Sequence, residues 1–268
     1  MGHRQRFYDQ LEAWGAPSAK LLPRWQRHDD TNEATIDHGA WSEYLSAYLR
    51  SAFEDGQNLM DYAHVRDADR VSLDAYVNML GAVPISTYSR AEQLAYWINL
   101  YNARTVQLVL AYLPIDSITQ INISPGNISR GPWGKKILNI EGEALSLNDV
   151  EHRIVRPIWR ECRVHYALNC AAIACPNLQP VAFGPANTEA MLEAGARAYV
   201  NHLRGARFDG GRLTVSKIYL WYAADFGGRP SGVLDHLRRY ADGELAKGLA
   251  GASRIHAYDY YWALNEAP

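Results

Sequence analysis

The sequence predicts an α+β fold in which a helical amino-terminal layer packs on a small antiparallel sheet. Apolar residues recur at helical spacing through the first half of the chain, whereas short segments around tight glycine turns are confined to the second half. The chain has 268 residues, 48% apolar and 21% charged, which is typical of a globular protein that buries a core. We expect an irregular lead-in over residues 1–38 and a single α+β domain over residues 39–268.

The clearest helix begins near residue 90. Ser89 and Glu92 fit a capping box, apolar residues follow at helical spacing, and Pro114 ends the run. A second cap-like start lies at Ser146. The same spacing predicts further helices over 41–53, 72–80, 150–158, 188–203 and 233–240.

The expected strands are short and lie after residue 135. Glu141-Gly142 and Asp209-Gly210-Gly211 are turn sequences flanked by alternating residues, and each predicts a hairpin. Single strands are expected over 164–168 and 258–262.

Composition and missing motifs exclude several function classes. Lys and Arg number 27 against 29 Asp and Glu, so the net charge of −2 argues against a nucleic-acid partner. No apolar run approaches the roughly 18 residues of a membrane helix, so no membrane insertion is expected. Neither G-x-G-x-x-G nor G-x-x-x-x-G-K-[ST] occurs, and no cofactor is predicted. The oligomeric state is not indicated.

Two asparagines stand three residues apart on the helix that begins near residue 90. Asn99 and Asn102 therefore share a face, and a buried amide must find hydrogen-bond partners. Either both side chains pin the helix to neighbouring loops, or they line a site.

Ionisable residues cluster where the helix after Ser146 begins. Asp149 can pair with Arg153, and His152 lies four residues before Arg156, as in an ordinary charged surface. Adjacent helix positions point about 100° apart, so the functional alternative is that either Glu151 or His152 points into a site.

The segment 164–176 carries the densest set of reactive side chains. In an extended strand, His165 and Asn169 share one face and Cys170 points the other way. If Asn169 instead caps a helical turn, Cys170 stands at its first position, where backbone N–H groups favour a thiolate. His165 is then a candidate base for Cys170, with Glu151 or an asparagine as the orienting group.

Other interpretations of the cysteines stay open. Cys170 and Cys175 can be small core residues, or they can form a disulfide across a short loop in an oxidising compartment. A zinc site with His165 and His152 is a further alternative. The C-x-x-x-x-C spacing is wide for zinc ligands and no second cysteine pair exists, so no metal is predicted.

Ordered motifs between Trp41 and Asn265 resemble the bacterial family called domain of unknown function 547. The blocks that carry the resemblance are 96–103, 145–152, 165–176, 216–226 and 258–265. The resemblance implies a papain-like or transglutaminase-like core and an exported, periplasmic or secreted protein, although residues 1–8 contain no apolar signal-peptide core. In those enzymes the cysteine precedes the histidine and starts a helix, whereas here Cys170 follows His165.

Together these observations predict a cysteine-dependent hydrolase or acyl-transferase acting on peptide-like amides. Cys170 is the expected nucleophile, His165 the general base and Glu151 its orienting group. The expected substrate-binding residues are Asn99, Asn102, Asn169, His152 and Trp133, the asparagines as amide donors near an oxyanion.

Two other functions fit the same residues. One is a non-catalytic protein that binds a peptide or a small thiol such as glutathione in an aromatic cleft. The other is a thiol-redox protein in which Cys170 and Cys175 cycle, although its spacing differs from the thioredoxin-like C-x-x-C.

Overall fold

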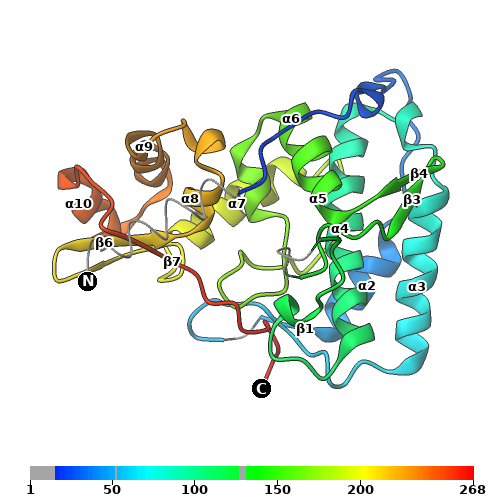
Figure 1. Ribbon diagram of the computed structural model, residues 1–268, viewed down its shortest axis with the longest axis horizontal. Coiled ribbons are helices and arrows are strands. Elements are labelled where there is room, and N and C mark those ends of the chain that lie inside the picture. The colour runs from blue at the N-terminus through cyan, green and yellow to red at the C-terminus, as the bar shows by residue number, and fades with distance from the viewer. Residues whose placement is uncertain (1–15, 52, 127–130) are drawn as a thin grey trace.

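The computed structural model describes residues 16–51, 53–126 and 131–268, and these form two lobes with separate hydrophobic cores (Figure 1). The expected α+β class is confirmed. The predicted lead-in falls partly outside the described residues, since residues 1–15 are not described. Residues 16–38 run along the helical lobe, where the backbone N–H groups of Lys20 and Leu22 donate to the carbonyls of His152 and Arg153.

The helical lobe is built around α4 (Arg90–Tyr112), whose residues from Glu92 to Ala103 are all buried. Ser89 caps this helix by accepting from the Glu92 N–H, as expected, but the Glu92 carboxylate accepts from the N–H of Ile36 and thereby fastens the lead-in. The other elements of this lobe are α2 (Gly39–Tyr48), α3 (Asp67–Ala82), β1 (Leu49–Arg50), β2 (Leu59–Met60), β3 (Leu138–Ile140), β4 (Glu143–Leu145) and the 3₁₀ turns η1 (Pro23–Gln26), η2 (Ile85–Thr87) and η3 (Ile118–Gln120).

The carboxy-terminal lobe is a three-stranded sheet with helices around it. Strand β6 (Arg212–Ser216) pairs antiparallel with β5 (Ala206–Asp209), as the predicted hairpin requires, and parallel with β7 (Ala257–Asp259). The expectation of an antiparallel sheet was therefore wrong for β7, because the chain passes through helices before returning to this edge. Those helices are α8 (Ile218–Trp221), η6 (Ala223–Phe226), α9 (Pro230–Tyr240) and α10 (Gly243–Gly251), and α7 (Thr188–Val200) precedes the sheet.

The connection between the lobes departs most from expectation. The helix predicted over 150–158 is split into α5 (Leu147–Asp149), a π-helical segment η4 (Val150–Val155) and α6 (Arg156–Trp159). The strand predicted over 164–168 is wrong, because Cys162–Tyr166 form a 3₁₀ helix, η5. The Glu161 carboxylate caps the N–H of Arg163, and none of the strands in the described ranges pairs with this segment.

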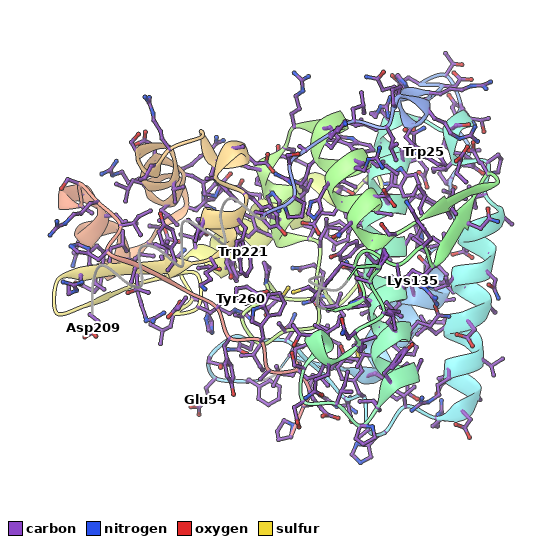
Figure 2. The ribbon with its side chains drawn as sticks, in the orientation of Figure 1. Trp25, Glu54, Lys135, Asp209, Trp221 and Tyr260 are labelled. Carbon is purple, nitrogen blue, oxygen red and sulfur yellow. The ribbon has the colours of Figure 1, made fainter. Side chains whose placement is uncertain are left out.

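The last predicted strand is shorter than expected. Only Ala257–Asp259 pair with β6, and residues 260–262 leave the sheet and approach the boundary between the lobes. Figure 2 shows Tyr260 and Trp221 side by side at this boundary.

Candidate functional site

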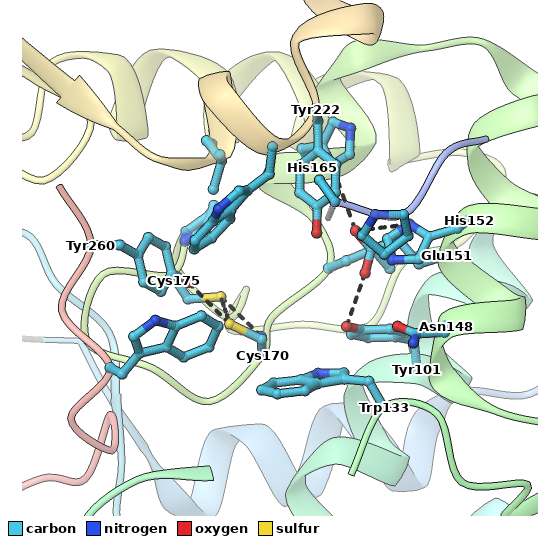
Figure 3. A pocket seen from close by; sticks show the side chains of 17 residues that line it. Tyr101, Trp133, Asn148, Glu151, His152, His165, Cys170, Cys175, Tyr222 and Tyr260 are labelled. Carbon is cyan, nitrogen blue, oxygen red and sulfur yellow. Dashed lines mark hydrogen bonds and ion pairs between the residues drawn. The ribbon is translucent and has the colours of Figure 1, made fainter. Parts of the chain in front are cut away.

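A cavity of about 510 Å³ lies between the two lobes and collects most of the reactive residues singled out in the sequence (Figure 3). A cavity of this size suits a small ligand. Its walls are formed by Ala16, Pro17, Tyr101, Trp133, Asn148, Glu151, His152, His165, Leu168, Cys170, Cys175, Pro176, Ile218, Trp221, Tyr222, Tyr260 and Trp262.

One wall is a tight turn that holds two cysteines. Within it, the Asn169 carboxamide accepts from the N–H of Ala171 at 2.8 Å and donates to the carbonyl of Pro176 at 2.7 Å. Ala171 adopts a left-handed conformation with φ of 59°, which closes the turn. No helix begins at Cys170, so the alternative in which Asn169 caps a helical turn is wrong. The sulfur atoms are instead brought together by the turn itself.

The two cysteine sulfur atoms are in direct contact in the cavity. Cys170 Sγ lies 2.7 Å from Cys175 Sγ and 3.1 Å from the Tyr260 hydroxyl, and both cysteines are free thiols. The backbone N–H of Cys170 donates to Cys175 Sγ at 2.9 Å. Cys170 is partly exposed to the cavity, whereas Cys175 is buried.

This arrangement favours loss of a proton from Cys175 over loss from Cys170. Burial opposes ionisation, but hydrogen bonds from Cys170 Sγ, the Tyr260 hydroxyl and backbone N–H groups lower the pKa of Cys175 below its ordinary value. Donating its proton to Cys175, together with burial, raises the pKa of Cys170. The two thiols therefore titrate as a coupled pair, in which Cys175 is the first to lose its proton. Behind the turn, the Arg204 guanidinium donates to the Ile173 carbonyl at 3.1 Å and attracts the charge on Cys175.

His165 lies on another wall, between two carboxylates. Its Nε2–H donates to Asp225 Oδ2 at 2.7 Å, and its Nδ1 lies 3.7 Å from Glu151 Oε1. The ring is stacked on Tyr222, with centroids 4.2 Å apart. Among the described residues, no hydrogen bond joins His165 to either sulfur atom of the pair, although all three side chains line the cavity.

Asp225 connects this histidine to a buried arginine. Its Oδ2 accepts from Arg156 Nε at 2.6 Å as well as from His165. Burial works against the charge, yet the hydrogen bonds from His165 and Arg156 lower the pKa of Asp225 to about 2. The carboxylate is therefore ionised at neutral pH.

The π-helical segment turns both Glu151 and His152 inward, where an α-helix was expected to admit one of them. Tyr101 donates to Glu151 Oε2 at 3.1 Å, and Arg156 lies 3.1 Å from His152 Nδ1. Burial lowers the pKa of His152 to about 4, so its ring is neutral at pH 7. A π-segment at a functional site is a recurring arrangement. The expected surface pair of Asp149 and Arg153 is found beside it at 3.2 Å.

The two helix asparagines predicted near an oxyanion use their carboxamides for hydrogen bonds to the backbone of neighbouring loops. Asn102 donates to the Ala167 carbonyl and accepts from the N–H of Asn169, both at 2.8 Å. Asn99 makes the same pair of contacts with Phe183, at 2.8 and 3.0 Å. None of the three predicted asparagines, Asn99, Asn102 and Asn169, lines the cavity. Both helix residues thus anchor loops, and the loop anchored by Asn102 leads into the cysteine turn.

Aromatic rings form the remaining walls. Tyr260 packs against Trp221 and Trp262 with ring centroids 4.9 and 4.7 Å apart, and Trp133 packs on Trp262 at 5.6 Å. Trp133 was expected at the site, and the structure places it in the lining. Apolar rings beside the thiols favour a ligand with apolar or planar groups.

Reasoning from individual residues missed Asp225, Tyr222 and Tyr260. Only the later blocks of the family resemblance contain these residues. They lie some sixty or more positions after His165, so no helical or strand periodicity relates them to it. It also missed the contact of Cys162 Sγ with His236 Nδ1 at 3.6 Å. Burial raises the pKa of Cys162 to about 11, so this pair is neutral.

Residues 85–200 match the family model described as "Protein of unknown function, DUF547", which supports the predicted family. The matched region contains η4, His165 and both cysteines of the turn, whereas Asp225 and Tyr260 lie beyond it. Neither a curated protein nor a solved structure matches the chain.

Within the described ranges, no group of three or more His, Cys, Asp or Glu side chains is arranged to hold a metal ion. The same part of the chain contains no helix with the length and apolar character needed to cross a bilayer.

Proposed function

We propose that the cavity is the site of a cysteine-dependent hydrolase or acyl-transferase acting on small peptide-like amides. The observation that supports it is a pair of sulfur atoms 2.7 Å apart in the same cavity as a histidine that lies between two carboxylates. A nucleophile with a nearby group that accepts its proton, and a positioned acid–base group, are the two requirements of acyl transfer through a covalent intermediate.

Cys170 is the attacking atom in this proposal because it is the more exposed sulfur. Its proton passes to Cys175 Sγ, and the Cys170 sulfur bonds to the carbonyl carbon of the amide. The Tyr260 hydroxyl, 3.1 Å from Cys170 Sγ, donates to the oxygen on which charge develops. Burial and the neighbouring thiols raise the pKa of Tyr260, so that its proton is retained.

His165 serves the leaving group rather than the nucleophile. It protonates the departing amine as the carbon–nitrogen bond breaks, which leaves a thioester on Cys170. In the next step His165 accepts a proton from water or from an acceptor amine, which attacks the thioester and releases the acid or the new amide, while Cys175 returns its proton to Cys170. Asp225 holds the imidazole through Nε2, and Nδ1, 3.7 Å from Glu151 Oε1, is the atom that gives and accepts the transferred proton.

The papain-like or transglutaminase-like relationship enters this proposal as a likeness in residue types. A cysteine, a histidine and a carboxylate line one cavity, but the histidine comes first in the chain and the nucleophilic sulfur contacts a second cysteine. Export to the periplasm, which the family resemblance implies, likewise remains a prediction.

The test is covalent trapping of an acyl group. Purified protein is mixed with p-nitrophenyl acetate and with a set of N-acyl amino-acid amides, and intact mass and peptide mapping follow the adduct. We expect acylation of Cys170 that is lost in Cys170→Ala, and slower turnover of the adduct in His165→Ala. The matched control is Cys162→Ser, which removes the thiol outside the cavity. Acylation of Cys162 alone, or of no cysteine, would overturn the proposal.

The second candidate is a binding protein for a peptide or a small thiol. The aromatic rings around the sulfur pair favour it, since a cavity of this kind can retain a ligand without reacting. Calorimetry with reduced glutathione distinguishes the two: saturable binding that survives Cys170→Ala, with no acyl adduct from any probe, indicates a binding protein.

A further inference from the structure

We propose that Cys170 and Cys175 form a dithiol that reduces small disulfides and closes into an intramolecular disulfide. This rests on the same sulfur pair as the proposed acyl transfer but predicts a different activity. The contact between the two sulfur atoms at 2.7 Å, in a cavity open to a small ligand, is the observation that points to it.

The turn holds the two thiols together through its own backbone. Besides the Asn169 contacts, the N–H of Cys175 donates to the Ala172 carbonyl at 2.9 Å. The carboxy-terminal segment fastens the outside of the turn, because the N–H groups of Ile173 and Ala174 donate to the carbonyls of Ala263 and Tyr261. Since these bonds do not involve the sulfur–sulfur contact, little rearrangement of the main chain is needed when the pair changes oxidation state.

The two sulfur atoms differ in the way that the exchange reaction requires. Thiol–disulfide exchange needs a thiolate to attack and a second thiol nearby to resolve the mixed disulfide. Cys170 is partly exposed and can reach a ligand, and the adjacent buried Cys175 accepts its proton. Cys175 then occupies the position from which it can attack the Cys170 sulfur.

The reaction balances with a small disulfide as the oxidant. Cys170 Sγ attacks one sulfur of R–S–S–R, a Cys170–S–S–R bond forms, and the first R–S⁻ leaves and takes up a proton. Cys175, as a thiolate after losing its proton to solvent, attacks Cys170 Sγ and expels the second R–S⁻, which is protonated in turn. The sum is one small disulfide reduced to two thiols and one Cys170–Cys175 disulfide formed.

The chemistry of the cavity defines the class of disulfide. Tyr260 contacts Cys170, Trp221 and Trp262 pack on Tyr260, and the Glu151 and His165 side chains supply polar groups on another wall of the cavity. A low-molecular-weight disulfide that carries amino-acid or short-peptide groups matches these walls, and a volume of about 510 Å³ is small for a folded protein substrate.

The experiment uses the reduced full chain and oxidised glutathione as the probe, in the absence of added reductant. The wild type should release two equivalents of glutathione per chain, and peptide mapping should find a disulfide between Cys170 and Cys175. The Cys175→Ser variant should release one equivalent and retain glutathione on Cys170. Cys162, whose pKa is raised to about 11, is the internal control and should react at least tenfold more slowly.

Three outcomes overturn this inference: all three cysteines stay reduced, Cys162 reacts first, or wild-type Cys170 retains its glutathione without closing. Should the Cys175→Ser variant fail to fold, the wild-type map and the released equivalents still decide the question. Acylation of Cys170 without disulfide closure would reject the exchange activity alone, whereas closure without acylation would reject the proposed acyl transfer alone.

Discussion

Removing the Asn102 carboxamide should loosen the cysteine turn, whereas removing that of Asn99 should not. Both side chains are buried on α4, and each makes two hydrogen bonds to loop backbone. The Asn102 bonds fix Ala167 and Asn169 at the entry to the turn. Because the two positions differ mainly in the loop that they hold, Asn99→Ala is a matched control for Asn102→Ala.

The expected loss of unfolding free energy follows from the backbone groups that each substitution leaves without hydrogen-bond partners. Each substitution leaves one buried N–H and one buried C=O unpaired, and each such group costs about 1–3 kcal/mol. We therefore expect both variants to lose about 2–6 kcal/mol of unfolding free energy, which is a large part of the total for a typical domain. Urea unfolding followed by tryptophan fluorescence measures this loss.

The two variants should differ in thiol reactivity. In Asn102→Ala the pH profile for iodoacetamide labelling of Cys170 and Cys175 should change, while in Asn99→Ala it should match the wild type. Equal profiles in both variants would refute the claim that Asn102 holds the turn. Should Asn102→Ala not fold, Asn102→Asp keeps the acceptor for the Asn169 N–H and tests the donor to Ala167 alone.

Two further predictions concern the remaining walls. Burial opposes ionisation of Asp225, but the hydrogen bonds from His165 and Arg156 lower its pKa to about 2. The ionised carboxylate therefore stabilises the fold at pH values above its pKa in the unfolded chain, near 3.8, and this stabilisation is lost as the pH falls towards 2. Asp225→Asn leaves the buried guanidinium unpaired and should cost about 3–5 kcal/mol in urea unfolding at pH 7; an unchanged midpoint would contradict the assigned ion pair. Tyr260→Phe removes a hydrogen bond that lowers the pKa of the sulfur pair, so the labelling profile should move to higher pH, while the exposed control Tyr261→Phe should leave it in place. A profile unmoved by Tyr260→Phe would contradict that contact.

Local sequence signals predicted most of the described helices and the hairpins β3–β4 and β5–β6, whereas the short antiparallel pair β1–β2 was not predicted. The Ser89 cap and the Pro114 stop define α4, and the glycine turns at 142 and 210–211 define β3–β4 and β5–β6. These features depend on neighbours along the chain. The prediction for residues 164–168 failed because their apolar pattern fits a strand as well as a helical turn. The Glu161 cap, and the absence of a pairing strand among the described residues, favour the 3₁₀ helix.

The site was only partly predictable for the same reason. Cys170, His165 and Glu151 do line one cavity, but their partners are set by tertiary contacts. Asp225 comes to His165 from another lobe, and Tyr260 reaches Cys170 because the chain leaves β7 after residue 259. The inward turn of both Glu151 and His152 depends on the π-helical segment, which spacing on an ideal helix does not reveal.

The ionisation of the cysteine pair is the claim on which both proposed activities rest. The most direct measurement is the rate of iodoacetamide labelling of each cysteine in the native, reduced protein between pH 5 and pH 9, resolved by peptide mass spectrometry. We expect the Cys170–Cys175 pair to label at a lower pH than an ordinary cysteine, whose pKa is about 8.5, and once per pair. Cys162 should stay nearly unlabelled, because a pKa of about 11 leaves roughly one thiolate in ten thousand at pH 7. Labelling of the pair only above pH 8, or no faster than Cys162, would contradict the account.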